Sequence, residues 1–297
     1  MADAEVIRYV PADRRLGRHV NHDPRSRRFP MRASGGVLLR SVRWQRRVPI
    51  WDQGDLGSCT GNAGLGCLAT DPFFATVDDT ERNALGGWSE QGAVALYAAA
   101  TTWDNFPGSY PPEDTGSDGL SVAKALTNAG MIAGYRHAFS LADLVSGLMV
   151  TPCIVGTEWL SGMYDHDPLG IIHPSGRVEG GHEYICDEYV QAGDTFGTAR
   201  QVAAVDLLGF TNSWGTGWAD DGRHFMPAAE FGELLARQGD ATFFLPAGLP
   251  APEPVPVPVD PDQVLADALR VWAHKPDASS SKRQRGAVRV WLAAKGL

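Results

Sequence analysis

The chain is predicted to fold as an α+β protein, with a helical half followed by a half rich in β-strands. Its 297 residues are 43% hydrophobic and 21% charged, which is enough to bury a sizeable core. Helical patterns lie in the first half, and short β-type runs between Gly, Pro and Asp turns lie in the second. This segregation is typical of an α+β layout with a cleft between the halves.

Three segments of the first half have helical patterns. Cys59–Leu68 begins with small and polar residues and continues as an apolar stripe. Residues 91–101 are rich in Ala, and 120–128 end before Gly130, a residue suited to a helix C-terminus. Ahead of these helices, residues 37–47 alternate apolar and polar side chains as an edge strand does.

Short strands are expected in the second half. Each is rich in residues that favour β-structure and is bounded by turn residues. The expected strands are residues 153–157, 184–186, 202–208 and 243–245. A short helical element is expected within 225–238, just before the last strand.

The chain is expected to divide into four parts. A basic arm, 1–36, precedes a body, 37–248, and a Pro-rich linker, 249–261, leads to a small tail, 262–297. The tail has two helical patterns whose apolar residues can pack together as a helical hairpin. Because such a hairpin has a marginal core, docking onto a protein partner is the alternative.

Charge is distributed unevenly along the chain. The whole chain has a net charge of −9, which argues against nucleic acid as a partner. Its first 47 residues nevertheless contain twelve Arg and four acidic residues, so the remainder is strongly acidic. The arm is therefore expected to pack on the acidic body, to act as an inhibitory segment or to dock a partner.

Cysteine content and hydropathy favour a cytoplasmic location. Four Cys are fewer than a secreted disulfide framework usually has. No stretch approaches the length of a membrane span, and no apolar run of a signal peptide precedes the N-terminal Arg residues. We therefore expect a reduced protein with no membrane contact.

Three short motifs carry candidate catalytic groups. The first, DQGDLGSCTGNA, contains Gln53 and Cys59. The second is Gly-Gly followed by His182, and the third, NSWGTGW, begins at Asn212. A thiol, a base and an amide able to orient that base are the groups that nucleophilic catalysis by cysteine needs.

The local sequence around Cys59 suggests how its thiol would be activated. A free thiol has a pKa of about 8.5 and reacts only as thiolate. Cys59 is expected at a helix N-terminus, where the helix dipole favours negative charge, and His182 would add an imidazolium nearby. Asn212 would fix the tautomer of His182, and Trp214 would shield that hydrogen bond from water.

Each of these residues also has a simpler interpretation. A lone Cys is more often a buried structural thiol, a lone His a core or loop residue, and an Asn beside Gly a turn residue. Trp214 on its own would be a core residue. The three motifs occur together in one chain, and this combination favours catalysis over the separate interpretations.

These motifs resemble those of papain-like cysteine peptidases, particularly bacterial or bacteriophage members, over roughly residues 39–246. The spacing from Gln53 to Cys59 is the same, and the Asn212 motif is nearly the family's own. The resemblance implies a papain-like fold, a peptide or protein substrate, and no metal or cofactor. It also implies a Cys59 acyl-enzyme, with His182 as base and acid, and Gln53 as an oxyanion donor with the Cys59 N–H.

The same resemblance implies a set of substrate contacts and shows several departures. The implied cleft residues are Gly116, Ser117, Gly181 and Trp214, of which the three small ones are equally compatible with plain turns. Thr60 stands where most members have Trp, and acidic residues follow His182 in place of an apolar strand. These departures concern substrate preference, because no catalytic group is lost.

Two other functions are compatible with the same residues. The first is a catalytically silent papain-like protein that serves in binding or in virion assembly, which the tail would suit as an attachment module. The second is transpeptidation or deamidation by the same acyl-enzyme, which differs from hydrolysis only in the acceptor.

Overall fold

The computed structural model describes residues 6–9, 16–31 and 38–248. The predicted linker and tail, 249–297, lie outside these residues, as do parts of the predicted arm. Within the described residues no helix has both the length and the apolar composition needed to cross a membrane.

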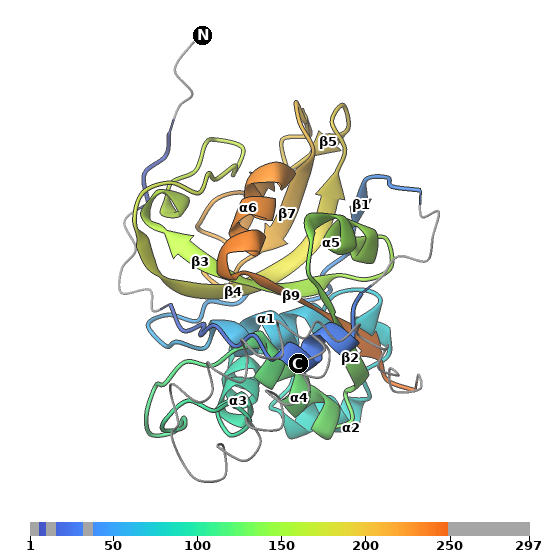
Figure 1. Ribbon diagram of the computed structural model, residues 1–297, viewed down its shortest axis with the longest axis vertical. Helices are drawn as coiled ribbons and strands as arrows, with labels where there is room; N and C mark the ends of the chain where they lie inside the picture. Colours follow the sequence, from blue (N-terminus) through green and yellow to red (C-terminus); the bar gives the residue numbers. More distant parts are fainter. Residues whose placement is uncertain (1–5, 10–15, 32–37, 249–297) are drawn as a thin grey trace, which may run out of the picture. The chain divides into compact units, whose positions relative to one another are not determined.

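The first half is helical (Figure 1). Its helices are α1 (Cys59–Leu68), α2 (Asp79–Ala84), α3 (Glu90–Ala100) and α4 (Gly119–Asn128), with short 3-10 turns at η1 (Pro24–Arg28) and η2 (Phe73–Ala75). Ser89 and Asp118 cap α3 and α4 by accepting hydrogen bonds from backbone N–H groups of the first turn. The helices bury a shared apolar core that includes Leu65, Leu96 and Val122.

The second half is built on one antiparallel sheet (Figure 1). Its order is β2-β9-β3-β4-β7-β8, with β1 paired to β4. The strands are β1 (Val42–Arg43), β2 (Ile132–Ala138), β3 (Cys153–Leu160), β4 (Val178–Val190), β7 (Leu207–Thr211), β8 (Arg223–Pro227) and β9 (Asp240–Pro246). A separate hairpin is formed by β5 (Thr195–Phe196) and β6 (Gln201–Val202).

Two helices and one 3-10 turn complete this half: α5 (Leu141–Leu148), α6 (Ala228–Gln238) and η3 (Ser161–Tyr164). Helix α6 packs against β3, β7 and β8, and α1 of the helical half packs against β4. The core between α5, α6 and the sheet includes several large aromatic side chains, among them Trp159, Tyr184, Phe210 and Phe231.

This architecture confirms the predicted α+β class and most of the predicted elements. The helix at Cys59–Leu68 has the predicted bounds. The helices predicted at 91–101 and 120–128 are α3 and α4, and each begins one residue earlier than predicted. The predicted strand at 202–208 is wrong, because β6 ends at Val202 and β7 begins only at Leu207. Between them the Asp206 carboxylate accepts hydrogen bonds from Tyr189 Oη and Ala192 N, and the chain turns there.

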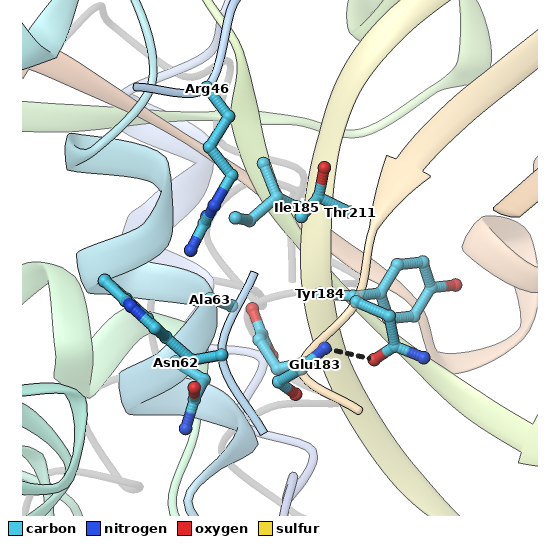
Figure 2. Close-up of a pocket in the computed structure, with 10 residues that line it drawn as sticks. Arg46, Asn62, Ala63, Glu183, Tyr184, Ile185 and Thr211 are labelled. Carbon is cyan, nitrogen blue, oxygen red and sulfur yellow. Dashed lines mark hydrogen bonds between the residues drawn. The ribbon is translucent and has the colours of Figure 1, made fainter. Parts of the chain in front are cut away.

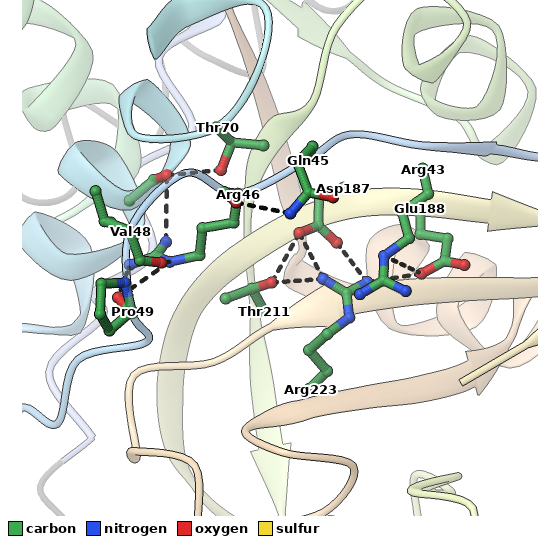
Figure 3. Close-up of polar contacts among 11 residues, drawn as sticks. Arg43, Gln45, Arg46, Val48, Pro49, Thr70, Asp187, Glu188, Thr211 and Arg223 are labelled. Atoms are coloured by element: carbon green, nitrogen blue, oxygen red, sulfur yellow. Dashed lines mark hydrogen bonds and ion pairs between the residues drawn. The ribbon is translucent and has the colours of Figure 1, made fainter. Parts of the chain in front are cut away.

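An ion-pair cluster lies inside the sheet, where β4, β7 and β8 meet (Figure 3). Both terminal nitrogens of Arg223 donate to Asp187, at 2.8 and 2.9 Å, and one also donates to Glu188 at 2.7 Å. Thr211 Oγ1 donates to Asp187 at 2.7 Å. The cluster accounts for two of the acidic residues that follow His182 in the sequence, Asp187 and Glu188, and it fixes the strand end that precedes Asn212.

Replacing Arg223 by Met is expected to lower the free energy of unfolding by about 3–5 kcal/mol, because buried Asp187 loses its cation and Glu188 keeps only the longer pair with Arg43 at 3.7 Å. Urea unfolding followed by tryptophan fluorescence measures the change. The matched control is Arg177→Met, which removes an exposed pair with Glu179 and should change stability by less than about 1 kcal/mol. Similar losses in the two variants would contradict the structural role of the cluster.

Candidate active site

Cys59 is the first residue of α1 and is completely buried. The preceding turn is held by Asp114, whose carboxylate accepts a hydrogen bond from Gly57 N at 2.9 Å. The backbone N–H groups of Thr60 and Glu183 act to lower the pKa of the thiol. Glu183 follows His182 directly in β4, and α1 packs against β4, so the predicted nucleophile lies near the strand that carries the predicted base.

His182 lies in β4, opposite Thr157 of β3, and its Nε2 is 2.8 Å from Asn212 Oδ1. Asn212 follows β7, whose last residue, Thr211, pairs with Ile185 of β4. The Asn212 oxygen also accepts a hydrogen bond from Ser213 N at 2.8 Å, so its carboxamide has a defined orientation (Figure 2). An oxygen partner assigns the proton to Nε2 and leaves the lone pair on Nδ1.

The Nδ1 atom of His182 is buried and has no hydrogen-bond partner among the described residues. In the assigned tautomer this nitrogen is the acceptor that a proton from the Cys59 thiol requires. The imidazole is therefore arranged as a general base would be: Nε2 donates to Asn212, and Nδ1 can accept a proton.

Aromatic rings enclose the imidazole of His182. Trp214 stacks on it with centroids 5.0 Å apart and planes at 29°, and Trp159 meets it edge-on at 5.1 Å. Trp218 packs in turn on Trp214. These rings exclude water from the His182–Asn212 hydrogen bond, which strengthens it electrostatically.

Gln53 ties the first motif to the third. Its Oε1 accepts a hydrogen bond from Ser213 Oγ at 2.6 Å, and its backbone N donates to Ser213 O at 2.9 Å. Its Nε2 donates to Leu56 O at 2.8 Å, within the turn that leads to Cys59. The amide is therefore fixed beside the start of α1, as an oxyanion donor has to be.

A small pocket adjoins these residues at the junction of α1 and the sheet (Figure 2). Its lining includes Asn62 of α1, Glu183 of β4 and Asn212. The guanidinium of Arg46 reaches into the same junction and donates to Gly66 O, and burial lowers the pKa of Arg46 to about 10. Among the described residues, no group of three or more His, Cys, Asp or Glu side chains is arranged to hold a metal ion.

Burial controls the protonation of the candidate nucleophile and base. It raises the pKa of Cys59 to about 12, although the backbone N–H groups of Glu183, Gly17 and Thr60 act in the opposite direction. Burial likewise lowers the pKa of His182 to about 4, against the hydrogen bond to Asn212. The thiol and the imidazole are therefore both neutral at pH 7, and the lowering of the thiol pKa expected from the helix N-terminus is outweighed.

The N-terminal arm contributes to the burial of Cys59 and lies across the site at residues 16–19. Gly17 O accepts a hydrogen bond from Ser117 N at 2.9 Å, and His19 N donates to Ser117 O at 2.7 Å. On the other side Arg18 N donates to Gly181 O at 3.0 Å. Main-chain bonds on both sides hold the arm as an extended peptide, parallel to the segment around Ser117.

Gly17 makes the closest approach of the arm to the body. A Cβ atom at this position would lie 2.0 Å from Gly57 O, so only glycine fits there. Gly116 meets the same arm residue from the opposite side, and a Cβ there would lie 2.4 Å from Gly17 O. Gly116 also has φ +71°, a conformation that favours glycine.

The structure thus places the predicted site residues as follows. Cys59, His182, Asn212 and Gln53 come together at the junction of α1, β4 and β7. Gly116, Ser117 and Gly181 each lie against residues 17–19 of the arm, and Trp214 lies between His182 and an arm residue, Tyr9, whose ring stacks on it at 6.2 Å.

Sequence reasoning missed several residues of this site. Arg18 is one of twelve Arg in the first 47 residues and has no distinguishing neighbour. Trp159 is separated from His182 by 23 positions, and only the β3–β4 register brings them together. Glu183 was noted only as an acidic departure, yet its side chain faces Arg18 and Asp240.

Comparison with solved structures identifies the fold as papain-like. Xylellain, a cysteine protease from Xylella fastidiosa, is 16% identical, with a TM-score of 0.55 over 80% of this chain and 98% of that one. The digestive procathepsin L 3 of the Tenebrio molitor larval midgut is 17% identical, with a TM-score of 0.50 over 74% of each chain. No family model and no curated protein sequence matches the chain. The described part of this chain has the papain-like α+β fold.

The buried histidines predict how stability depends on pH. Burial lowers the pKa of His224 well below its usual value of 6.5, so below about pH 6.5 the unfolded chain takes up a proton that the folded chain does not. The free energy of unfolding should therefore fall as the pH is lowered from about 6.5 towards 5. His224→Phe should flatten that slope by about 1 kcal/mol per pH unit.

Urea unfolding at several pH values measures this slope. His173→Gln is the control, because His173 is exposed and pairs only with Glu230 at the surface among the described residues. The control should keep the slope of the unmodified chain. An unchanged slope in His224→Phe would show that burial of this imidazole does not govern its protonation.

Proposed function

We propose that the chain is a cysteine peptidase that hydrolyses peptide bonds through an acyl-enzyme on Cys59. The observation that carries the proposal is the buried hydrogen bond from His182 Nε2 to Asn212 Oδ1, beside a thiol at the start of α1. The bond holds the imidazole in the tautomer whose free nitrogen accepts the thiol proton. The likeness to xylellain supports the fold on which this chemistry would be built.

The proposed reaction has two stages, acylation of Cys59 and hydrolysis of the resulting thioester. His182 Nδ1 takes the Cys59 proton, and Sγ attacks the peptide carbonyl to form a C–S bond. The Cys59 N–H and the Gln53 amide donate to the oxyanion, and removal of one such donor typically slows a reaction by about 10²–10³. The imidazolium protonates the leaving amine as the C–N bond breaks. Water, deprotonated by His182, then attacks the thioester and regenerates the thiol.

The finer assignment is to a bacterial type of this enzyme acting in the cytoplasm. It is supported by the likeness to a bacterial protein, xylellain, over nearly all of that chain. All four cysteines are buried free thiols, as is usual in a reducing compartment.

The arm is proposed to close the cleft in this state. Residues 17–19 occupy the backbone positions on Ser117 and Gly181 that a peptide substrate would need. Displacement of the arm would admit water to Cys59 and His182, which would remove the desolvation that keeps both groups neutral. The thiolate–imidazolium pair would then form in the open cleft, before a substrate binds.

Gly17→Ala should displace the arm, because the added Cβ cannot fit 2.0 Å from Gly57 O. The rate at which iodoacetamide alkylates Cys59 at neutral pH, followed by intact mass, should rise at least about tenfold as the thiol becomes accessible and its pKa falls. Val20→Ala alters a part-exposed arm residue and serves as the control. Equal rates in the two variants would argue against closure by the arm.

In the Gly17→Ala chain, Cys59→Ala should abolish hydrolysis of unfolded casein while leaving the circular dichroism spectrum unchanged. The matched control is Cys67→Ala, a buried thiol of the same helix, which should retain activity. Hydrolysis that persists without Cys59 would overturn the proposed nucleophile. If Cys59 is readily alkylated but no peptide is cleaved, the fold serves binding rather than catalysis.

A further inference from the structure

An acidic slot lies beside the candidate nucleophile, on three neighbouring strands. In the sheet register Gly156 of β3 pairs with Glu183 of β4 on one side and with Asp240 of β9 on the other. Across the three strands, the paired residues are therefore Glu183, Gly156 and Asp240, in that order. A Cβ on Gly156 would lie 2.5 Å from Glu183 Oε2 and 3.0 Å from Asp240 Oδ2, so the two carboxylates converge over the bare glycine.

The arm fills this slot with the side chain of Arg18, which is 0% exposed. Its Nη2 pairs with Asp240 Oδ2 and donates to Gln238 O at 2.7 Å, and its Nε would lie 2.6 Å from a Cβ on Gly156. Burial lowers the pKa of Arg18, but Asp240 and Glu183 outweigh it and the net pKa is raised. A guanidinium is thus bound as a cation with no access to solvent.

The position of Arg18 is that of a residue in a bound peptide. Its backbone N–H donates to Gly181 O at 3.0 Å, and the N–H of its neighbour Gly17 lies close enough to the Cys59 thiol to lower the pKa of that thiol. These bonds use only main-chain atoms, which any peptide possesses. In a peptide held by these main-chain contacts, the residue that follows the one over Cys59 would therefore place its side chain in the slot.

When the arm leaves, the slot favours a cation over any other side chain. An apolar residue would leave Asp240 without its cation and would leave Glu183, whose pKa burial and Asp240 raise well above its usual range, buried without a hydrogen-bond donor, which is unfavourable. Both oxygens of Glu183 are buried and have no hydrogen-bond partner in the described part of the chain, so the slot retains acceptors for further donors. Arg18 bonds to Asp240 and to Gln238 O through Nη2, and its Nε and Nη1 have no hydrogen-bond partner among the described residues. A planar guanidinium has further donors that could reach the Glu183 carboxyl, and it therefore suits the slot better than an ammonium does.

We propose that Glu183, Gly156 and Asp240 form the specificity subsite of this enzyme, and that it selects arginine, and less strongly lysine, in a peptide substrate. The proposal rests on the peptidase function proposed above and names its substrate class. Arg18 is then a built-in mimic of the preferred side chain, held in place by the same charges.

The first experiment labels Cys59 in the full-length Gly17→Ala chain with peptidyl epoxides that carry Arg, Lys, Leu or Glu at each of the three residues nearest the epoxide. Intact mass gives the labelling rate. The labelling rate of the Arg epoxide should exceed that of the Leu epoxide by at least about tenfold at one of the three positions, since hydrogen bonds to charged partners contribute most. Adding Asp240→Asn should collapse that ratio, whereas Glu158→Gln, a carboxylate paired with Arg237, should preserve it.

The second experiment requires no chemistry at Cys59. A fluorescent peptide with the sequence of residues 16–22, and its version with Leu in place of Arg18, are titrated with the same Gly17→Ala chain. Binding of the Arg peptide at least about tenfold more tightly supports the subsite even if no peptide is cleaved. Equal binding, or epoxide labelling led by Leu, overturns the subsite and leaves the peptidase function intact. Absence of hydrolysis together with Arg-selective binding overturns the peptidase function alone.

Discussion

Strand β4 is the constraint on which the rest of the site depends. Successive residues of a strand point to opposite faces of a sheet, so His182 faces the aromatic core while Glu183 faces the helical half and the arm. Pairing with β7 brings Asn212 to His182, and pairing with β3 and β9 brings Asp240 near Glu183. A shift of one residue in this register would exchange the two faces and remove both the base and the acidic slot.

The arm and the site stabilise each other while the thiol stays unreactive. The arm places the Arg18 cation beside Asp240 and Glu183. It covers Cys59 with Gly17, a position where only glycine fits. The same burial keeps the thiol protonated and the imidazole neutral. In the proposed enzyme, protection of the nucleophile and recognition of a basic side chain would be two consequences of one contact, because a similar peptide would replace the displaced arm.

Local chemistry made the helical elements and the three candidate catalytic motifs predictable. Caps and apolar stripes are encoded within a few residues, as Asp118 and the helix after it show, and Gln53 and Cys59 are close in sequence. The acidic slot depends on strand order, which brings together residues from β4, β3 and β9 that are far apart in the chain. The position of the arm could not be predicted from the sequence either. Its main-chain hydrogen bonds are independent of residue type, and Arg18 is one Arg among many.

The most direct test of the central claim is the ultraviolet absorbance of the thiolate, titrated with pH in the Gly17→Ala chain and in the same chain with Cys59→Ala. The account predicts a thiolate band at neutral pH that depends on Cys59, is lost in acid, and is weak in the unmodified chain, where burial raises the pKa of the thiol to about 12. A Cys59 thiol that titrates at about 8.5 or above even when the arm is displaced would contradict an activated Cys59–His182 pair.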